Sequence, residues 1–289
     1  GITSFHAVRQ TRRILNAFKV GHAGTLDPMA TGVLPLAFGE ATKTVFYAVE
    51  GLKEYRFTIC WGESRNTDDA DGVVTGVSDK RPNEDEIISA LSQFIGEIEQ
   101  VPPAYSAVKI GGRRAYDLAR SDRPVKLKAR PILIKQFELM EIVDKDHAIF
   151  SVISGKGAYM RGLARDIALA LGTKGHISQL RRTRLGPFDE EDAISLDKLV
   201  ELGHTAPADE LMRPVETVLD DIPALDLTEG EARRLKRGQS ISALKVAQRM
   251  PLNGLICGDT IVAMSEGKLV ALARFEGGDI RPVRVLNLY

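Results

Sequence analysis

Glycine and proline crowd into one short stretch near the start of this 289-residue chain. Between residues 21 and 39 they stand at Gly21, Gly24, Pro28, Gly32, Pro35 and Gly39. Glycine allows backbone conformations that other residues avoid, and proline removes a backbone donor, so this spacing excludes a long regular helix. We expect a loop that is threaded through a buried site.

Asp27 is the carboxylate inside this stretch, and Pro28 fixes the peptide that follows it. An Asp-Pro pair in a loop is, by itself, an ordinary turn. The full run Gly-His-Ala-Gly-Thr-Leu-Asp-Pro-Met-Ala-Thr-Gly-Val-Leu-Pro over residues 21–35 is far more specific. Asp27 is therefore the first candidate for a reactive group.

Hydrophobic patterns elsewhere predict both helices and strands. We expect helices that begin with Ser4 as N-cap and that cover residues 84–94 and 159–171. We expect strands at 55–61, 131–141 and 147–154. Irregular segments, not crossover helices, separate these strands, which favours an α+β fold with a mixed, largely antiparallel central sheet.

A domain boundary is expected in the acidic, proline-containing stretch 205–223. Beyond it, Thr228 and Glu231 form a capping-box pattern for a short helix that ends at Gly238. Short strands are expected at 261–265, 268–275 and 281–288. We therefore expect a first domain over residues 1–220 and a small β-rich domain over 222–289.

The net charge is zero, but the charges are segregated along the chain. Residues 104–135 carry nine Lys or Arg against two Asp, and residues 156–184 and 232–289 are also basic. Residues 63–100 and 186–231 are acidic. Such segregation indicates either a basic face that binds nucleic acid or simply solvated surfaces.

Several classes of protein are disfavoured by what the sequence lacks. It has no phosphate-binding glycine loop, no dinucleotide fingerprint, no nucleophile elbow and no metal-ligand spacing among its five histidines. No apolar run has the length of a membrane span, no signal-peptide pattern is present, and two distant cysteines suggest a reducing, cytoplasmic setting. We expect no cofactor and no metal.

Several blocks of sequence, in order, resemble the TruB family of tRNA pseudouridine synthases. The run over 21–35 resembles the family's catalytic motif, and Gly39-Glu40-Ala41-Thr42-Lys43 its next block. A third block combines Tyr55-Arg56, Gly62 and the run from Thr67 to Gly72. Three later blocks also resemble the family: Pro102 to Lys109, Ser154 to Arg161, and Leu180-Arg181-Arg182-Thr183. The tail resembles a PUA domain, an RNA-binding module. Family members usually have a strand and a Lys-Pro-x-Gly element before Ile-Thr-Ser, and this sequence begins at Gly1.

The resemblance implies conversion of a uridine in the T loop of tRNA, conventionally position 55, to pseudouridine. Asp27 would act beside the sugar, either as a nucleophile or as a base. Arg161 would pair with Asp27 and keep it ionised; the alternative is an ordinary helix-terminal arginine. Tyr55 would stack on the base or assist proton transfer; the alternative is a strand tyrosine packed in the core.

Further residues are expected to bind the RNA. His22 would stack where the flipped nucleotide leaves a space, and Tyr159 and Leu180 would line the base pocket or else only pack in the core. A basic insertion over about 101–130 would contact phosphates. Its cations include Lys109, Arg113, Arg114, Arg120, Arg123, Lys126 and Lys128. We expect a monomer whose partner is tRNA, with no membrane.

Three other hypotheses stay open. The chain could be a non-catalytic RNA-binding or tRNA-folding protein on the same scaffold, which would work without Asp27. It could be a hydrolase of the base–sugar bond, which would release free uracil. Related enzymes also act inside guide-RNA complexes, which the tRNA-type motifs and the lack of a long basic extension disfavour.

Overall fold

The computed structural model describes residues 1–106, 108–111, 113, 114, 116, 127–202, 211–252 and 254–288. Its chain divides into two compact units. The first comprises Gly1–Ala7, Gly24–Pro35 and Val49–Ala193, and the second comprises Val8–Ala23, Leu36–Ala48 and Ile194–Tyr289.

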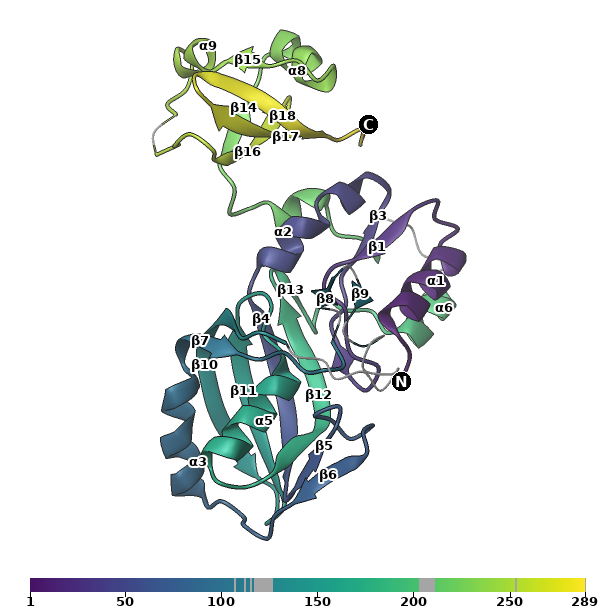
Figure 1. Cartoon of the computed structure of the whole chain (residues 1–289). Helices are drawn as coiled ribbons and strands as arrows, with labels where there is room; N and C mark the ends of the chain where they lie inside the picture. Colours follow the sequence, from purple (N-terminus) through teal and green to yellow (C-terminus); the bar gives the residue numbers. More distant parts are fainter. Residues whose placement is uncertain are drawn as a thin grey trace. The chain divides into compact units, whose positions relative to one another are not determined.

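The first unit is built on a seven-stranded sheet in which six strands follow the order β13-β12-β4-β11-β10-β7 (Figure 1). All neighbours in this order are antiparallel, while the short β2 pairs with β12 in parallel. The expected mixed, largely antiparallel sheet is therefore confirmed. The strands are β2 (Thr31–Gly32), β4 (Lys53–Trp61), β7 (Gly96–Gln100), β10 (Arg130–Ile142), β11 (His147–Ser154), β12 (Gly175–Leu185) and β13 (Phe188–Asp189).

Two helices pack against this sheet, α3 (Glu84–Leu91), which continues into η2 (Ser92–Phe94), and α5 (Met160–Ala170). The core at this sheet contains Phe57, Trp61, Phe137 and Phe150. The ring centre of Phe150 lies 5.8 Å from that of Phe57, 6.1 Å from that of Trp61 and 5.6 Å from that of Phe137. Burial of an aromatic side chain of this size contributes about 2–3 kcal/mol, so this cluster stabilises the sheet that positions the site.

Two small hairpin-like pairs extend from the first unit. Strands β5 (Glu63–Arg65) and β6 (Val74–Val77) flank the turn over residues 67–72. Strands β8 (Lys109–Ile110) and β9 (Arg113–Arg114) pair within the basic insertion. The bridge between Asp69 and Ile177 joins the 67–72 turn to β12.

The helix near the start, α1 (Ser4–Ile14), already includes Ser4, so the predicted N-cap was one residue off. The hydroxyl of Thr3 accepts the N–H of His6 at 3.2 Å and takes the capping place. The Ser4 hydroxyl instead accepts the N–H of Leu26 at 2.9 Å and donates to its carbonyl at 3.3 Å. Ser4 thus holds the loop next to Asp27.

The segment 21–39 is not a loop throughout. Strand β1 (Val20–His22) pairs antiparallel with β3 (Leu36–Phe38) in the second unit. Residues 24–33 of the first unit, which are irregular apart from the short β2, are called the Asp27 loop from here on. The glycines of this segment thus exclude a long helix but are compatible with the short strands β1 and β3.

The second unit contains a five-stranded sheet in the order β14-β16-β17-β18-β15. Its core is formed by side chains between Leu225 and Ile280. The expected capping box at Thr228 and Glu231 is present at the start of α8. The sheet and its helices are β14 (Ala224–Asp226), α8 (Glu229–Lys236), β15 (Ile241–Ser242), α9 (Ala243–Ala247), β16 (Thr260–Ser265), β17 (Lys268–Glu276) and β18 (Asp279–Val285).

The second unit also includes earlier segments of the chain. Lys43 donates to the carbonyl of Val285 at 2.8 Å, and Glu40 accepts the N–H of Asn287 at 2.8 Å, so residues 36–48 bind the end of the sheet. The remaining elements are η1 (Gly39–Lys43), α2 (Val45–Glu50), α6 (Leu196–Leu202) and η3 (Val215–Val218). No helix in the described ranges is long and apolar enough to cross a membrane.

Candidate active site

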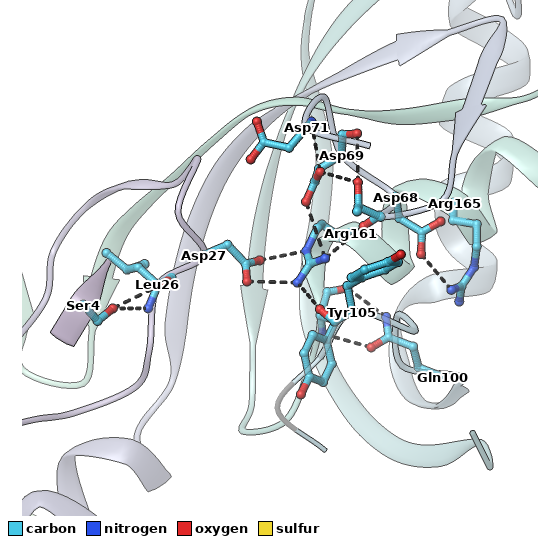
Figure 2. Close-up of polar contacts among 12 residues, drawn as sticks. Ser4, Leu26, Asp27, Asp68, Asp69, Asp71, Gln100, Tyr105, Arg161 and Arg165 are labelled. Carbon is cyan, nitrogen blue, oxygen red and sulfur yellow. Dashed lines mark hydrogen bonds and ion pairs between the residues drawn. The ribbon is translucent and has the colours of Figure 1, made fainter. Parts of the chain in front are cut away.

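Asp27 and Arg161 form a bidentate ion pair (Figure 2). The Nε of Arg161 donates to Asp27 Oδ2 at 2.8 Å, and its Nη2 donates to Oδ1 at 2.9 Å. Parallel bonds of this kind fix both the distance and the plane of a carboxylate. The pairing expected from the sequence is present, and its catalytic role stays a prediction.

The two partners differ in access to solvent. The Arg161 side chain is 5% exposed, while that of Asp27 is 32% exposed. The guanidinium is therefore a fixed part of the protein, and the carboxylate presents an open side to a substrate. This arrangement suits a group that must react while held in one orientation.

Arg161 is also surrounded by acceptors from other segments. Its Nη1 donates to the carbonyl of Thr67 at 2.9 Å and lies 3.4 Å from Asp69 Oδ2, and its Nη2 donates to the carbonyl of Tyr105 at 3.0 Å. The single guanidinium thus joins the Asp27 loop, the 67–72 turn and the start of the basic insertion. The carboxyl groups of Asp27 and Asp69 thus contact the same guanidinium.

The 67–72 turn has its own network. Asp69 is buried, and its Oδ1 accepts the hydroxyl of Thr67 at 2.5 Å and the N–H of Asp71 at 3.1 Å. From the sequence, this run is identified only as part of a family motif. Its cluster of acidic residues was the signal that one of them is buried against a cation.

Asp68 forms a second ion pair beside the first. Its Oδ2 lies 3.0 Å from Nη1 of Arg165, whose Nη2 donates to the carbonyl of Val101 at 2.7 Å. Burial raises the pKa of Asp68 to about 6, although the charges of Arg165 and Arg161 pull it down. The desolvation of this carboxylate outweighs the attraction of its partners.

Gln100 sets the start of α5, on which Arg161 is the second residue. Its side-chain amide accepts the N–H of Tyr159 at 2.9 Å and donates to the Tyr159 carbonyl at 3.0 Å. A Cβ on Gly162 would lie 3.2 Å from the Gln100 amide, so glycine there gives this side chain room. No sequence pattern signals Gln100, because nothing local connects residues 100 and 159.

Tyr55 and Leu180 lie on adjacent strands of the sheet, β4 and β12. Tyr55 is half-buried and packs against the core, and burial raises the pKa of its hydroxyl, while interaction with Arg182 lowers it. Leu180 is buried in the core cluster and stands opposite Phe57. Both therefore have the packing role that the sequence left open, and their contact with a base stays a prediction.

The other predicted residues are placed less fully. Tyr159 is half-buried at the start of α5, and the guanidinium carbon of Arg130 lies 6.0 Å from its ring centre. His22 lies on β1 of the second unit, and its place relative to Asp27 stays a prediction. The side chains of Lys109, Arg113 and Arg114 lie outside the described residues, as do Arg120, Arg123 and Lys126, while Lys128 is exposed.

In the ranges that the structure describes, no group of three or more His, Cys, Asp or Glu side chains is arranged to bind a metal ion. The acidic residues around Arg161 are instead occupied by a cation, a hydroxyl and backbone donors.

Comparison with known families identifies two matching models. Residues 12–160 match the TruB family pseudouridylate synthase (N terminal domain), and residues 161–220 match the tRNA pseudouridylate synthase B C-terminal domain. The chain is 58% identical over 288 residues to the tRNA pseudouridine synthase B of Rhodospirillum rubrum, covering 100% of this chain and 94% of that protein. It is 51% identical over 288 residues to the protein of that name from Gluconacetobacter diazotrophicus, covering 99% and 94%.

Solved structures with a similar fold include two multi-component complexes. One is an H/ACA RNP bound to a substrate RNA containing 2'-deoxyuridine, with a TM-score of 0.74 and 27% identity over 99% of this chain and 82% of that one. The other is a Cbf5-Nop10-Gar1 complex, with a TM-score of 0.73 and 29% identity over 96% of this chain and 76% of that one.

Proposed function

Because this chain belongs to the TruB family of pseudouridylate synthases, we propose that it isomerises a uridine of transfer RNA to pseudouridine. The resemblance seen in the sequence is thereby confirmed at the level of the family. The observation that supports this site is the bidentate ion pair of Asp27 and Arg161. In this pair the carboxylate is accessible to solvent and is held in one plane.

The proposed reaction needs a carboxylate beside the ribose. The bond from the sugar to the base nitrogen breaks, the base turns, and a ring carbon bonds to the sugar and loses its proton. Asp27 would act as a nucleophile toward the sugar or as a base. Arg161 would keep Asp27 ionised, and Tyr55 would stack on the base or help to move the proton.

The substrate uridine is proposed to lie in the T loop of tRNA. A paired or stacked base is out of reach of Asp27, so it must be flipped out, which costs a few kcal/mol. Stacking on His22 and lining by Tyr159 and Leu180 would offset this cost. The curated relatives are more similar to this chain than the guide-RNA structures are, which favours free tRNA.

Three further features belong to the proposal. We propose a catalytic domain over residues 1–220 with phosphate-contacting cations in the insertion near 101–130, among them Lys109, Arg113 and Arg114. We propose a PUA-like RNA-binding domain over 222–289, which the five-stranded sheet with its own core supports. We propose a monomer that acts in the cytoplasm on tRNA, without cofactor or metal.

The test is pseudouridine formation on an unmodified tRNA transcript, with a metal chelator and no added cofactor. Nucleosides are separated by chromatography after digestion, because the isomerisation leaves the mass unchanged. Wild type should form pseudouridine at the T-loop position, and Asp27→Asn should bind tRNA but form none. Asp85→Asn, an exposed carboxylate on α3, is the matched control and should retain activity.

Each alternative predicts another result. A pure RNA-binding protein would bind tRNA tightly without forming pseudouridine. A hydrolase would release free uracil and leave an abasic ribose. Pseudouridine that persists in Asp27→Asn would show that another group carries the reaction.

A further inference from the structure

Arg182 contacts both ends of the Asp27 loop and has no part in the roles assigned to Asp27, Arg161 and Tyr55. Its Nε donates to the carbonyl of Val33 at 2.9 Å, and its Nη2 donates to the carbonyl of Gly24 at 2.9 Å. Residues 24 and 33 are the first and last of the loop. One side chain thus bridges the two ends of the segment that presents Asp27.

The backbone of Arg182 holds the same loop. Its carbonyl accepts the N–H of Val33 at 2.8 Å, and in the sheet register it stands opposite Gly32 of β2. Gly32 has φ +98°, and a Cβ there would lie 2.1 Å from the Arg182 carbonyl oxygen. The contact is so close that only glycine fits, so the second end of the loop is fixed by the side chain and the main chain of one residue.

On the other side of β12, Arg182 stands opposite Tyr55 of β4. Burial raises the pKa of the Tyr55 hydroxyl, and the positive charge of Arg182 opposes this rise. Arg182 therefore binds the Asp27 loop directly and is paired with Tyr55 across the two strands.

Stability alone does not account for this arginine. Its side chain is fully buried, with 1% of the residue exposed, and among the ion pairs of the described residues none involves it. A buried cation without a carboxylate costs free energy, and an apolar residue of similar volume is often as stable or more so. Its charge also reaches Lys53, whose pKa is lowered to about 8, mainly by burial and then by Arg182.

We propose that Arg182 is a positioning residue for the isomerisation, which holds the two ends of the Asp27 loop together and sets the Tyr55 hydroxyl beside them. This inference rests on the proposed function. It does not require Arg182 to touch the RNA, since its donors are directed at the protein. Its loss should therefore slow the chemical step and leave tRNA binding intact.

The experiment compares wild type, Arg182→Lys, Arg182→Met and the control Arg184→Met in single-turnover reactions with saturating enzyme. Arg184 lies on the same strand; its side chain is 41% exposed and is paired with Glu54. Filter binding gives the Kd for tRNA, and thermal denaturation followed by Trp61 fluorescence shows whether the first unit is folded. Pseudouridine formation by wild type establishes the proposed function first, so a failure there is distinct from a failure of this inference.

We expect Arg182→Met to lower the single-turnover rate by about 100-fold, the scale of a small misplacement of a reacting group, with the Kd changed by less than about 3-fold. Arg182→Lys keeps the charge but reaches only one end of the loop, so it should recover part of the rate. In the Tyr55→Phe background, Arg182→Lys should lower the single-turnover rate by a smaller factor than it does in wild type, because the Tyr55 hydroxyl is already absent.

Wild-type rates in both Arg182 variants would overturn the proposal, as would a rise in Kd that matches the fall in rate. If Arg182→Met does not fold, Arg182→Lys alone decides between these results. If neither variant folds, Arg182 serves the fold and not the placement of the loop, and the proposal is overturned as well.

Discussion

The carboxylate of Asp27 meets the guanidinium of Arg161 along one edge, through bonds of 2.8 and 2.9 Å, although 134 residues separate them in the chain. The same guanidinium also binds the carbonyls of Thr67 and Tyr105. One side chain therefore fixes three segments that are distant in sequence. A small change in its shape should affect all three.

Arg161→Lys keeps the positive charge but removes the planar guanidinium that forms the two parallel hydrogen bonds. An ammonium group cannot form two parallel bonds to Asp27 and still reach the two carbonyls, so the carboxylate should lose its fixed plane. We expect the single-turnover rate of pseudouridine formation to fall by about 100-fold. Arg81→Lys, which alters an ion pair with Asp146 away from the site, is the control. A rate equal to wild type in Arg161→Lys would show that the plane of Asp27 does not matter.

Gly32→Ala should strongly destabilise the first unit. Its Cβ would meet the backbone of Arg182, and overpacking of this kind costs about 1–3 kcal/mol. Gly96→Ala is a matched control, since Gly96 has φ +99° and nothing within 4 Å of its Cβ position. Urea unfolding followed by Trp61, the one tryptophan of the chain, should give a smaller free energy of unfolding for Gly32→Ala than for Gly96→Ala. Equal values would mean that the close contact carries no strain.

The raised pKa of Asp68 predicts a pH-dependent stability. The folded carboxyl has a pKa of about 6, above its unfolded value of 3.8, so it takes up a proton more readily in the folded state. Its contribution to stability is therefore fully present below pH 3.8 and is lost as the pH rises through 6. When the pH is lowered from 8 to 5, the free energy of unfolding of wild type should increase by about 1 kcal/mol relative to that of Asp68→Asn. The check is the difference in Tm between the two proteins at each pH, and a constant difference would contradict the assignment.

Replacing Lys109, Arg113 and Arg114 by glutamine should weaken tRNA binding and flatten its salt dependence. Each phosphate contact that is lost removes about 0.7–0.9 from the slope of log K against log salt, because fewer counterions are released. The measurement is the Kd for tRNA at several salt concentrations. Lys145→Gln with Lys198→Gln serves as the control, and an unchanged slope in the triple variant would exclude these cations as phosphate contacts.

Much of the fold could be predicted because its elements carry local signals. Strand β4 shows alternating burial from Phe57 to Trp61, and the helix after Thr228 begins with a capping box. Strand β12 has no such pattern, since register shifts at Ile177/Gln179 and Arg182/Arg184 interrupt the alternation. That strand could be identified only through the family resemblance.

Some residues of the candidate site could likewise be predicted from the sequence, and others could not. Asp27 and Arg161 stand in specific motifs, so the sequence alone is enough to identify them. Gln100 and Arg182 could not be assigned a role, because each acts through backbone groups far away in the chain. A buried arginine without a carboxylate also contradicts the usual expectation that arginine is exposed.

The position of β12 in the chain has a consequence for biosynthesis. This strand pairs with β4, and its residues hold the Asp27 loop and the 67–72 turn, yet it is translated only at residues 175–185. A nascent chain that ends before β12 contains Asp27 but not the strand that supports it. Contacts of such long sequence separation form late, because loop closure costs entropy first. The Asp27 carboxylate is thus set in place only after most of the first unit has been synthesised.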